Sequence, residues 1–437
     1  MEITFAQSLG DQDGQRVCLQ GFAQTIRKQS KTCFLLLRDK TGLIQCVVDE
    51  SSPDLFAQAE SLATESVVKI TGLVCKEERA MGGYEVQIQE LIILSVSEAQ
   101  KPLPIFSGDA ESVDPNVRMD YRWLDLRKSE KRLVFEVWTA LEQALRLFWI
   151  KRGFLEIHSP KLMSAASEGG AEFFEVSYFD RKAYLAQSPQ FYKQMAMASG
   201  FDSVFEVGPV FRAESSFTPR HATEFTGYDM ELSWIESHED VMKVWEEAIA
   251  FALTEIKTSL GDRIQELYGR ELIIPTLPFP RITLKDAKTL LKELGVVDQR
   301  DGDLSPEEER EISAIVKERY GHEFAYITEY PKKVRAFYHM RLESDPNLTK
   351  SFDLLWSGIE ITTGAQREHR YEQLKQQAVE KGVKVESIQT YLDFFRYGCP
   401  PHGGMGAGAA RMVMKILDLP NIREATYLHR SVHRLTP

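Results

Sequence analysis

The segment that most constrains the fold is residues 203–234, which is predicted to form a strand, a polar loop and a returning strand. The returning strand alternates apolar and polar side chains, the period-two pattern of a strand that is buried on one face. Its apolar positions are Tyr228, Met230, Leu232 and Trp234, and its polar positions are Asp229, Glu231 and Ser233. We therefore expect one face of this strand to be core and the other face to be acidic.

Charged residues also lie at the end of the outgoing strand of this segment and in the loop that follows it. Arg212 and Glu214 are two residues apart and are predicted to point the same way, and Arg220 and His221 lie in the loop. A sheet face that displays guanidinium, carboxylate and imidazole groups needs a polar ligand, because unpaired charge on a packed sheet is costly. A polyanion that carries a base would fit, and the alternative is a surface ion pair between Arg212 and Glu214.

The composition describes an ordinary globular protein of two or three domains, with 437 residues, 43% hydrophobic and 27% charged. No apolar run approaches the ~20 residues that span a bilayer, and no secretory signal segment precedes the first predicted strand, so we expect a cytoplasmic location and no membrane contact. The five cysteines are scattered, which argues against a disulfide framework or a zinc site. The net charge of -12 excludes nucleic-acid binding by bulk electrostatics and leaves only locally basic faces for it.

Short β-rich runs fill residues 1–100, with one helical stretch between the third and fourth runs. This order predicts a Greek-key barrel of the OB type, a fold that binds single-stranded nucleic acid through aromatic stacking and base-edge hydrogen bonds. Phe34 and Gln45 lie on the second and third predicted strands, where a base could meet them. The apolar neighbours of Phe34 favour a core position instead. Residues 101–125 contain Pro102, Pro104 and Pro115 and are predicted to be a hinge.

The second domain, residues 126–437, begins with an amphipathic helix predicted over 129–151 and a strand that Pro160 ends. A helix is predicted from Ser237 to about Leu260, and residues 272–327 are predicted to be a small insertion with a capping box at Ser305. The glycine-rich stretch 403–408 is predicted to be a turn that leads into a helix carrying Arg411.

A hairpin is predicted about Ser357 and Gly358, which would bring Asp353 near Glu360 and Thr363. Two carboxylates and a hydroxyl are oxygen ligands of the kind that Mg²⁺ uses when substrate phosphates complete its shell. The alternative is a solvated acidic hairpin.

Three stretches in this order resemble the signature motifs of class II aminoacyl-tRNA synthetases. The first is the helix and strand that end at Pro160, the second is Phe211-Arg212-Ala213-Glu214 with its loop and return strand, and the third is Gly406-x-Gly408-x-x-Arg411. Within that class nearly the whole chain resembles the aspartyl-tRNA synthetases of the archaeal and eukaryotic type. The resemblance implies an α+β protein in which an OB domain reads the anticodon and an antiparallel-sheet catalytic domain, flanked by helices, dimerises around Pro160.

The resemblance also implies the substrates and their ligands. Such enzymes use ATP and Mg²⁺ to form aspartyl-adenylate from L-aspartate and then charge tRNA(Asp). By position, Arg212 holds the α-phosphate, Glu214 and Phe225 hold the adenine, and His221 and Arg411 hold the outer phosphates. The implied ATP site also includes Arg220, Glu360 and Gly408. Mg²⁺ is implied at Asp353, Glu360 and Thr363, and anticodon contacts at Phe34, Gln45 and Glu85.

The aspartate site is implied by the same positions. Lys193 and Arg367 match the residues that face the side-chain carboxylate, with Arg212 and Thr363 beside them. Glu168, Gln190 and Asp229 match the residues around the rest of the amino acid. Two cations in a closed pocket would favour a carboxylate over an amide. The alternatives are an asparaginyl-tRNA synthetase, which shares the three motifs, an aspartate-activating paralogue that acts without tRNA, and a catalytically inactive RNA-binding relative.

The chain departs from the pattern of its family at three places. Thr363 stands where serine is usual, and the segment Leu428-His429-Arg430-Ser431 keeps only the arginine of the usual Phe-Pro-Arg-Asp. Gln24 occupies a position linked to accepting or refusing tRNA(Asn), and glutamine fits neither group. Charging of tRNA(Asn) is therefore a second candidate activity.

Overall fold

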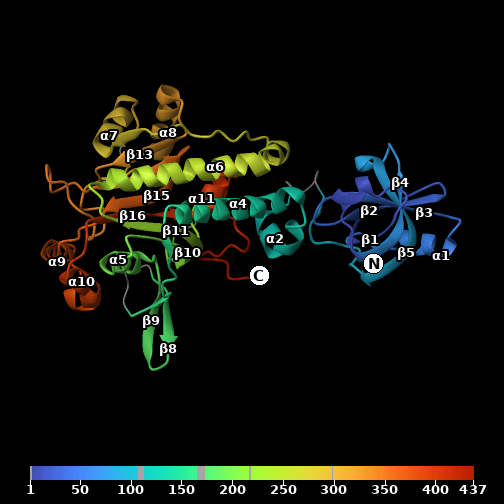
Figure 1. The fold of residues 1–437 in the computed structure, drawn as a ribbon, viewed down its shortest axis with the longest axis horizontal. Coiled ribbons are helices and arrows are strands. Elements are labelled where there is room, and N and C mark those ends of the chain that lie inside the picture. The colour runs from blue at the N-terminus through green and yellow to red at the C-terminus, as the bar shows by residue number, and fades with distance from the viewer. Residues whose placement is uncertain (1, 107–112, 165–172, 216–217, 298) are drawn as a thin grey trace. The chain divides into compact units, whose positions relative to one another are not determined.

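The structure is a computed structural model of the 437-residue chain, and it describes residues 2–106, 113–164, 173–215, 218–297 and 299–437. These residues form two compact units, Met1–Pro104 and Ile105–Pro437. Figure 1 draws the first unit in blue and the second from cyan to red. No helix of the described residues is both long and apolar enough to cross a membrane.

The first unit is a closed five-stranded barrel in the order β1-β2-β3-β5-β4, with β3 and β5 parallel. Its elements are η1 (Ala6–Asp11), β1 (Arg16–Gln29), β2 (Thr32–Arg38), β3 (Leu43–Asp49), α1 (Pro53–Glu60), β4 (Val67–Lys76), η2 (Met81–Gly83) and β5 (Tyr84–Ser95). Inward residues such as Leu35, Ile70 and Val86 fill the barrel, and Phe56 of α1 packs against them. The predicted OB fold is confirmed.

Phe34 lies outside the core of this barrel. It is partly exposed, whereas its neighbours Cys33 and Leu35 are fully buried, because successive residues of β2 alternate between the two faces. The core position that the local pattern favoured for Phe34 is therefore wrong.

The second unit is built on an eight-stranded sheet in the order β12-β13-β14-β15-β16-β11-β10-β6. Its strands are β6 (Leu155–Glu156), β10 (Ser203–Phe211), β11 (Glu224–Ser233), β12 (Arg281–Thr283), β13 (Phe324–Thr328), β14 (Ser351–Trp356), β15 (Ile359–Gln366) and β16 (His402–Gly408). All pairings are antiparallel except β10 with β6 and β12 with β13. The predicted antiparallel catalytic sheet is confirmed.

Two predictions about this unit need correction. Strands β12 and β13 come from residues 272–327, so this segment contributes one edge of the main sheet and is more than an insertion. The glycine-rich stretch 403–408 is a strand, β16, and not a turn. A Cβ atom on Gly404 would lie 2.2 Å from the Met230 carbonyl oxygen, so glycine lets β16 pack closely against β11.

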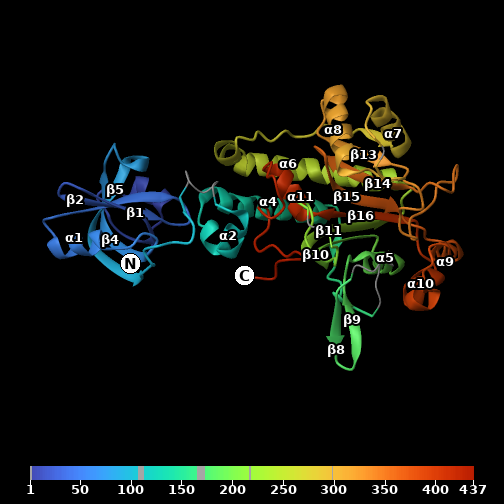
Figure 2. The same cartoon turned by 180° about the vertical axis from the view of Figure 1, so that it is seen from behind.

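Helices cover the apolar face of the sheet. The long helices α4 (Ser129–Lys151) and α6 (His238–Tyr268) and the shorter α11 (Ala409–Ile416) share one core with inward residues of the sheet such as Tyr228 and Met405 (Figures 1 and 2). The predicted caps at Ser237 and Ser305 are both present, and α6 extends past the predicted end at Leu260.

The remaining helices are α2 (Pro115–Asp120), α3 (Arg122–Asp125), α5 (Gln190–Ala198), α7 (Leu284–Glu293), α8 (Pro306–Tyr320), α9 (Tyr371–Glu380), η4 (Val385–Ile388) and α10 (Gln389–Arg396). A small sheet contains β7 (Leu162–Met163), β8 (Glu175–Tyr178) and β9 (Arg181–Leu185). Because α2 and α3 belong to the second unit, the part of the predicted hinge from residue 105 onward is joined to that unit.

Candidate active site

A cavity of about 770 Å³ opens on the polar face of the main sheet. Its walls come from α5, the loop between β10 and β11, strands β11, β15 and β16, and the start of α11. Twelve of the residues predicted from the sequence line it: Gln190, Arg212, Glu214, Arg220, His221, Phe225, Asp229, Glu360, Thr363, Arg367, Gly408 and Arg411.

Two described residues that were predicted for the ATP, aspartate and Mg²⁺ sites do not line the cavity. Lys193 and Asp353 are buried behind it, in contact with residues that do. Glu168 lies outside the described residues.

One end of the cavity combines an aromatic ring with two charged groups. The guanidinium of Arg212 lies 5.4 Å from the centre of the ring of Phe225, near the start of β11. Arg212 also lies 3.7 Å from a carboxylate oxygen of Glu214, so the surface ion pair considered above exists. Both partners nevertheless face the cavity, and both are accessible to a ligand there.

Three further basic groups lie next to this end. Arg411 donates to the backbone oxygen of Glu360 at 2.7 Å, and Arg220 donates to Glu309 at 2.5 Å. The third is His221, where burial and the charge of Arg411 lower the pKa of the imidazole. A concentration of guanidinium groups around one partly open space suits a ligand with several negative charges.

The opposite end of the cavity has a floor of paired buried charges, which come from β11, from α5 and from the residue that follows β15. Lys193 donates to Asp229 at 2.9 Å and lies 3.4 Å from Glu231, while Arg367 donates to Glu231 at 2.9 Å. Burial raises the pKa of Asp229 above its usual value, in spite of Lys193. Burial acts in the same direction on Glu231, but Arg367 and Lys193 hold the pKa of Glu231 below its usual value.

This arrangement changes the interpretation of the two cations. We expected Lys193 and Arg367 to be free for a ligand carboxylate, but each already has a carboxylate partner within the protein. The set of Lys193, Arg367, Asp229 and Glu231 is formally neutral. A bound carboxylate would add a negative charge to a balanced group, and Arg367 is the cation of this group that faces the cavity.

Buried amide and ring side chains form a chain of hydrogen bonds behind the floor of the cavity. Gln194 accepts from Gln190 at 2.9 Å and from the Tyr391 hydroxyl at 3.0 Å, so its amide nitrogen is left to donate to His402 Nε2 at 3.0 Å. His402 Nδ1 then donates to the Pro400 oxygen at 2.8 Å, which assigns the neutral tautomer. Burial lowers the pKa of His402 to about 4.

The predicted magnesium ligands lie together on the β14–β15 hairpin. Asp353 pairs with Thr363 across the two strands, and the Thr363 hydroxyl donates to Glu360 at 3.1 Å. Asp353 Oδ2 accepts from Arg335 at 2.5 Å, whereas Asp353 Oδ1 is buried and has no hydrogen-bond partner among the described residues. An unsatisfied buried carboxylate oxygen beside a second carboxylate fits a cation.

Protein groups alone do not complete such a site. Among the described residues, no group of three or more His, Cys, Asp or Glu side chains could hold a metal ion. Burial raises the pKa of Asp353 to about 6, with Arg335 opposing the rise and Glu360 adding to it.

Sequence reasoning missed several side chains that support the site. They are Glu231, Gln194, Glu309, Arg335 and His402. Glu231 was placed on the acidic face of its strand but was given no role. A buried carboxylate on a strand requires a buried cation, and that requirement could have indicated its pairing with Arg367. Nothing in the local sequence connects Glu309 of α8 with Arg220.

The other predicted sites are accessible in their own units. In the barrel, Gln45 donates to Glu85 at 2.9 Å, and both are partly exposed on neighbouring strands beside Phe34. Gln24 accepts from Arg38 at 2.9 Å. In the second unit Pro160 is exposed, and its neighbours Ser159 and Lys161 both bind the buried carboxylate of Glu206.

Known proteins share this arrangement. A profile of the family described as "tRNA synthetases class II (D, K and N)" matches residues 114–431, and one described as "OB-fold nucleic acid binding domain" matches residues 17–94. The chain is similar to the aspartate–tRNA(Asp/Asn) ligase of Aeropyrum pernix, with 44% identity over 97% of this chain and 96% of the relative. It is also similar to the aspartate–tRNA(Asp) ligase of Thermococcus kodakarensis, with 37% identity over 97% of each chain.

Solved structures give the same result for the fold. The asparaginyl-tRNA synthetase from Pyrococcus horikoshii, complexed with asparaginyl-adenylate, superposes with a TM-score of 0.91 at 34% identity and covers 100% of both chains. The relatives extend over both units and over every described residue that lines the cavity. The chain therefore belongs to the class II aminoacyl-tRNA synthetases, in the aspartate–tRNA ligase family.

Proposed function

We propose that this chain activates L-aspartate with ATP and transfers it to tRNA(Asp), with tRNA(Asn) as a second candidate acceptor. The observation that carries the proposal is that one cavity joins a basic, aromatic-lined end to an end floored by Asp229 and Arg367. A nucleotide and a small amino acid would meet where these ends join, beside Arg212.

The chemistry follows from where charge develops. The α-carboxylate of aspartate attacks the α-phosphorus of ATP, the bond to the leaving pyrophosphate breaks, and negative charge grows on phosphoryl oxygens. Arg212 at the α-phosphate and Arg411, Arg220 and His221 at the outer phosphates would stabilise that charge. The nucleophile is already ionised, so no general base is needed. Glu214 and Phe225 would hold the adenine amino group and ring.

Asp353, Glu360 and Thr363 are the residues that would hold Mg²⁺. When bound, the ion supplies electrostatic neutralisation of the phosphate oxygens. Arg335 orients Asp353 by donating to Asp353 Oδ2 at 2.5 Å, and Asp353 Oδ1 has no hydrogen-bond partner among the described residues.

We place the aspartate side chain at the floor formed by Gln190, Asp229 and Arg367, with Lys193 acting through Asp229. Selection of aspartate over asparagine then depends on Arg367, which pairs with Glu231 and also lines the cavity. An amide cannot accept from a guanidinium as strongly as a carboxylate does. Glu168 stays part of this proposed site through the sequence resemblance alone.

We also propose a homodimer, anticodon recognition by Phe34, Gln45 and Glu85 in residues 1–100, and a cytoplasmic location. Around Pro160 the second unit exposes apolar side chains that a partner subunit would cover. They are Leu147, Ile150, Leu155 and Leu162, each between 42% and 57% exposed.

Amino-acid-dependent ATP–pyrophosphate exchange tests the amino acid, and charging of tRNA(Asp) and tRNA(Asn) transcripts tests the tRNA range. We expect exchange with aspartate to exceed exchange with asparagine by about 10² or more. Faster exchange with asparagine would replace the proposal by the second candidate, an asparaginyl-tRNA synthetase, which the structural similarity to the Pyrococcus horikoshii enzyme favours. Exchange without any charging of tRNA would favour a paralogue that acts without tRNA.

A further inference from the structure

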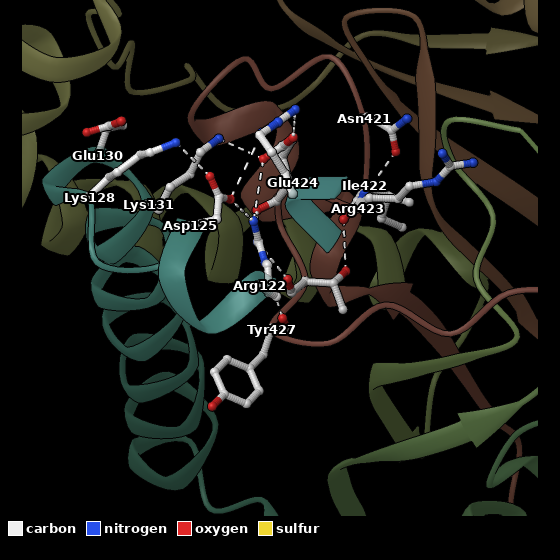
Figure 3. Close-up of polar contacts among 12 residues, drawn as sticks. Arg122, Asp125, Lys128, Glu130, Lys131, Asn421, Ile422, Arg423, Glu424 and Tyr427 are labelled. Carbon is white, nitrogen blue, oxygen red and sulfur yellow. Dashed lines mark hydrogen bonds and ion pairs between the residues drawn. The ribbon is translucent and has the colours of Figure 1, made fainter. Parts of the chain in front are cut away.

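A buried cluster of charges joins the helices α2–α4 to residues 421–427, and none of its members lines the cavity. Asp125 is at its centre with 0% exposure, and Arg122 beside it is 1% exposed. Arg122 donates to one Asp125 oxygen at 2.6 Å, and Lys128 donates to the other at 2.9 Å. Figure 3 shows the Arg122 guanidinium between Asp125 and the chain that leads to Tyr427.

A second carboxylate, Glu424, comes from the C-terminal segment itself. Lys131 lies 2.7 Å from Glu424, Arg118 lies 2.8 Å from it, and Arg122 lies 3.7 Å from it. The cluster therefore holds four cations and two carboxylates. Buried positive charge in excess of the carboxylates requires further acceptors.

Backbone carbonyls of the C-terminal segment are those acceptors. Arg122 donates to the backbone oxygens of Glu424 at 3.2 Å, Thr426 at 3.0 Å and Tyr427 at 3.3 Å. The indole of Trp138 on α4 donates to the Ala425 oxygen at 2.6 Å. A guanidinium can serve Asp125 and three carbonyls at once because its donors form a rigid planar fork, whereas the ammonium of a lysine cannot reach them all.

The segment that Arg122 holds is bonded in turn to the loop of the cavity that carries Arg220 and His221. The amide of Ile422 donates to the Pro219 oxygen at 2.8 Å, and the amide of Thr223 donates to the Arg430 oxygen at 3.1 Å. These two bonds bracket Arg220 and His221 in the chain. The side chain of Ile422 itself lines the cavity.

We propose that Arg122 is a positioning residue for the nucleotide end of the site, acting through residues 422–430 on the loop that carries Arg220 and His221. The proposal rests on the proposed function, in which this loop binds the phosphates of ATP. Arg122 is buried on α3 and does not line the cavity. Its replacement should weaken the binding of ATP and leave the binding of aspartate unchanged.

The loop needs such support because it places Arg220 and His221 next to a further cation, Arg411 of α11. Burial and the charges of Arg411 and Arg220 lower the pKa of His221, and Arg411 donates to the Arg220 oxygen at 3.4 Å. Without ATP these groups would tend to separate, and backbone bonds from a fixed segment keep the loop in its binding geometry. Preorganisation of this kind affects the ligand that the loop contacts and leaves the other end of the cavity unchanged.

The test compares Arg122→Lys with Arg132→Lys as a matched control. Arg132 is on α4, pairs with Glu136 at 2.8 Å, and is about half exposed, so the control makes the same substitution in an ion pair that does not contact residues 421–427. Pyrophosphate exchange gives the KM for ATP and for aspartate separately. Amide hydrogen exchange of residues 218–224 reports on the loop directly.

We expect Arg122→Lys to raise the KM for ATP by about tenfold, to leave the KM for aspartate within about twofold, and to speed amide exchange at residues 220–223. Arg132→Lys should match the parent in all three. Trp138→Phe, which removes only the bond to Ala425, should shift the same quantities in the same direction by less, and it replaces Arg122→Lys if that variant does not fold.

A folded Arg122→Lys with the parent KM for ATP and parent exchange at residues 220–223 would overturn the proposal. An equal rise in both KM values would also overturn it, because a general loss of structure would act on both substrates. If the parent itself exchanges pyrophosphate with neither aspartate nor asparagine, the proposed function fails. The hydrogen-exchange comparison of the two variants then decides the positioning role alone.

Discussion

Arg367 and Glu231 form a buried ion pair at the floor of the cavity, with Arg367 Nε donating to Glu231 Oε1 at 2.9 Å. Arg367 also donates to the Gly404 oxygen at 2.9 Å, so β11, β15 and β16 are joined at this point. The pair therefore fixes a cation at the floor of the site and balances its charge within the protein. A ligand carboxylate would share Arg367 with Glu231 and would not neutralise it alone.

Replacing Glu231 by glutamine should destabilise the protein. Glu231→Gln would leave Arg367 and Lys193 facing only Asp229, and breaking a buried ion pair costs about 3–5 kcal/mol of unfolding free energy. Urea unfolding followed by circular dichroism measures the change. Glu247→Gln is the control, because Glu247 pairs with Arg152 at the surface, where the loss should be about 0–1 kcal/mol. Equal stability of the two variants would contradict a structural role for the pair.

Arg212 should be needed for the chemical step. Arg212→Ala should lower the rate of aspartate-dependent pyrophosphate exchange by about 10² or more, because it removes charge from the proposed α-phosphate position. Arg212→Lys should recover only part of that loss, since an ammonium lacks the planar fork. Arg181→Lys is the control: Arg181 lies over Tyr178 at 5.6 Å as Arg212 lies over Phe225, but on the small sheet and outside the cavity. Exchange at the parent rate by Arg212→Ala would remove the catalytic assignment.

The sequence was most informative where local rules decide the structure. The alternation in 228–234 predicted correctly that Tyr228 and Met230 of β11 are core, but it was wrong for Trp234, which follows the strand and is 70% exposed. The helical spacing over 129–151 predicted α4. Both depend only on neighbours along the chain. The cavity residues came from the motifs and their order, which a resemblance supplied.

The errors came from long-range pairing. Nothing near residue 403 reveals that the glycines form a central strand, because the reason is the close approach of Glu231 and Met230 from β11. The partners of Lys193 could not be predicted for the same reason, since Asp229 and Glu231 reach it only after the sheet is assembled. Likewise, β12 and β13 resemble insertion elements until they pair with β14 at the sheet edge.

The hydroxyl of residue 363 should matter, and its methyl group should not. Thr363→Ser keeps the oxygen that donates to Glu360 at 3.1 Å, so the Mg²⁺ concentration for half-maximal exchange should match that of the parent. Thr363→Val keeps the shape but loses the oxygen, and that concentration should rise by about tenfold. A magnesium titration at fixed ATP measures both variants. An unchanged Thr363→Val would exclude residue 363 from the metal site.

Substitutions at the neighbouring residues Phe34 and Leu35 of β2 should affect different properties, tRNA charging for Phe34 and stability for Leu35. Phe34→Ala removes a ring from the outer face of the barrel, so kcat/KM for tRNA(Asp) should fall by about tenfold, the value of one lost base stack. Its pyrophosphate exchange and its thermal midpoint should stay at the parent values. Leu35→Ala empties a fully buried position and should instead destabilise the barrel by about 2–5 kcal/mol. If Phe34→Ala also lowers stability and leaves charging intact, its anticodon role is wrong.

Acidification should lower the free energy of unfolding because of the buried His402. Burial holds the pKa of His402 at about 4 in the folded chain, against 6.5 for an exposed histidine, because the ring is enclosed and its Nε2 already accepts from Gln194. Between these two values the unfolded chain binds a proton at His402 and the folded chain does not, so the free energy of unfolding falls as pH decreases from about 6.5 to about 4.

The loss over that range should approach about 3 kcal/mol from this residue. Urea unfolding of the parent and of His402→Asn at several pH values measures it. The variant should be less stable near neutral pH and should have a shallower slope across this range, since it has no imidazole to protonate. Identical slopes for the parent and His402→Asn would show that His402 binds its proton equally in the folded and unfolded chains, which would contradict the lowered pKa.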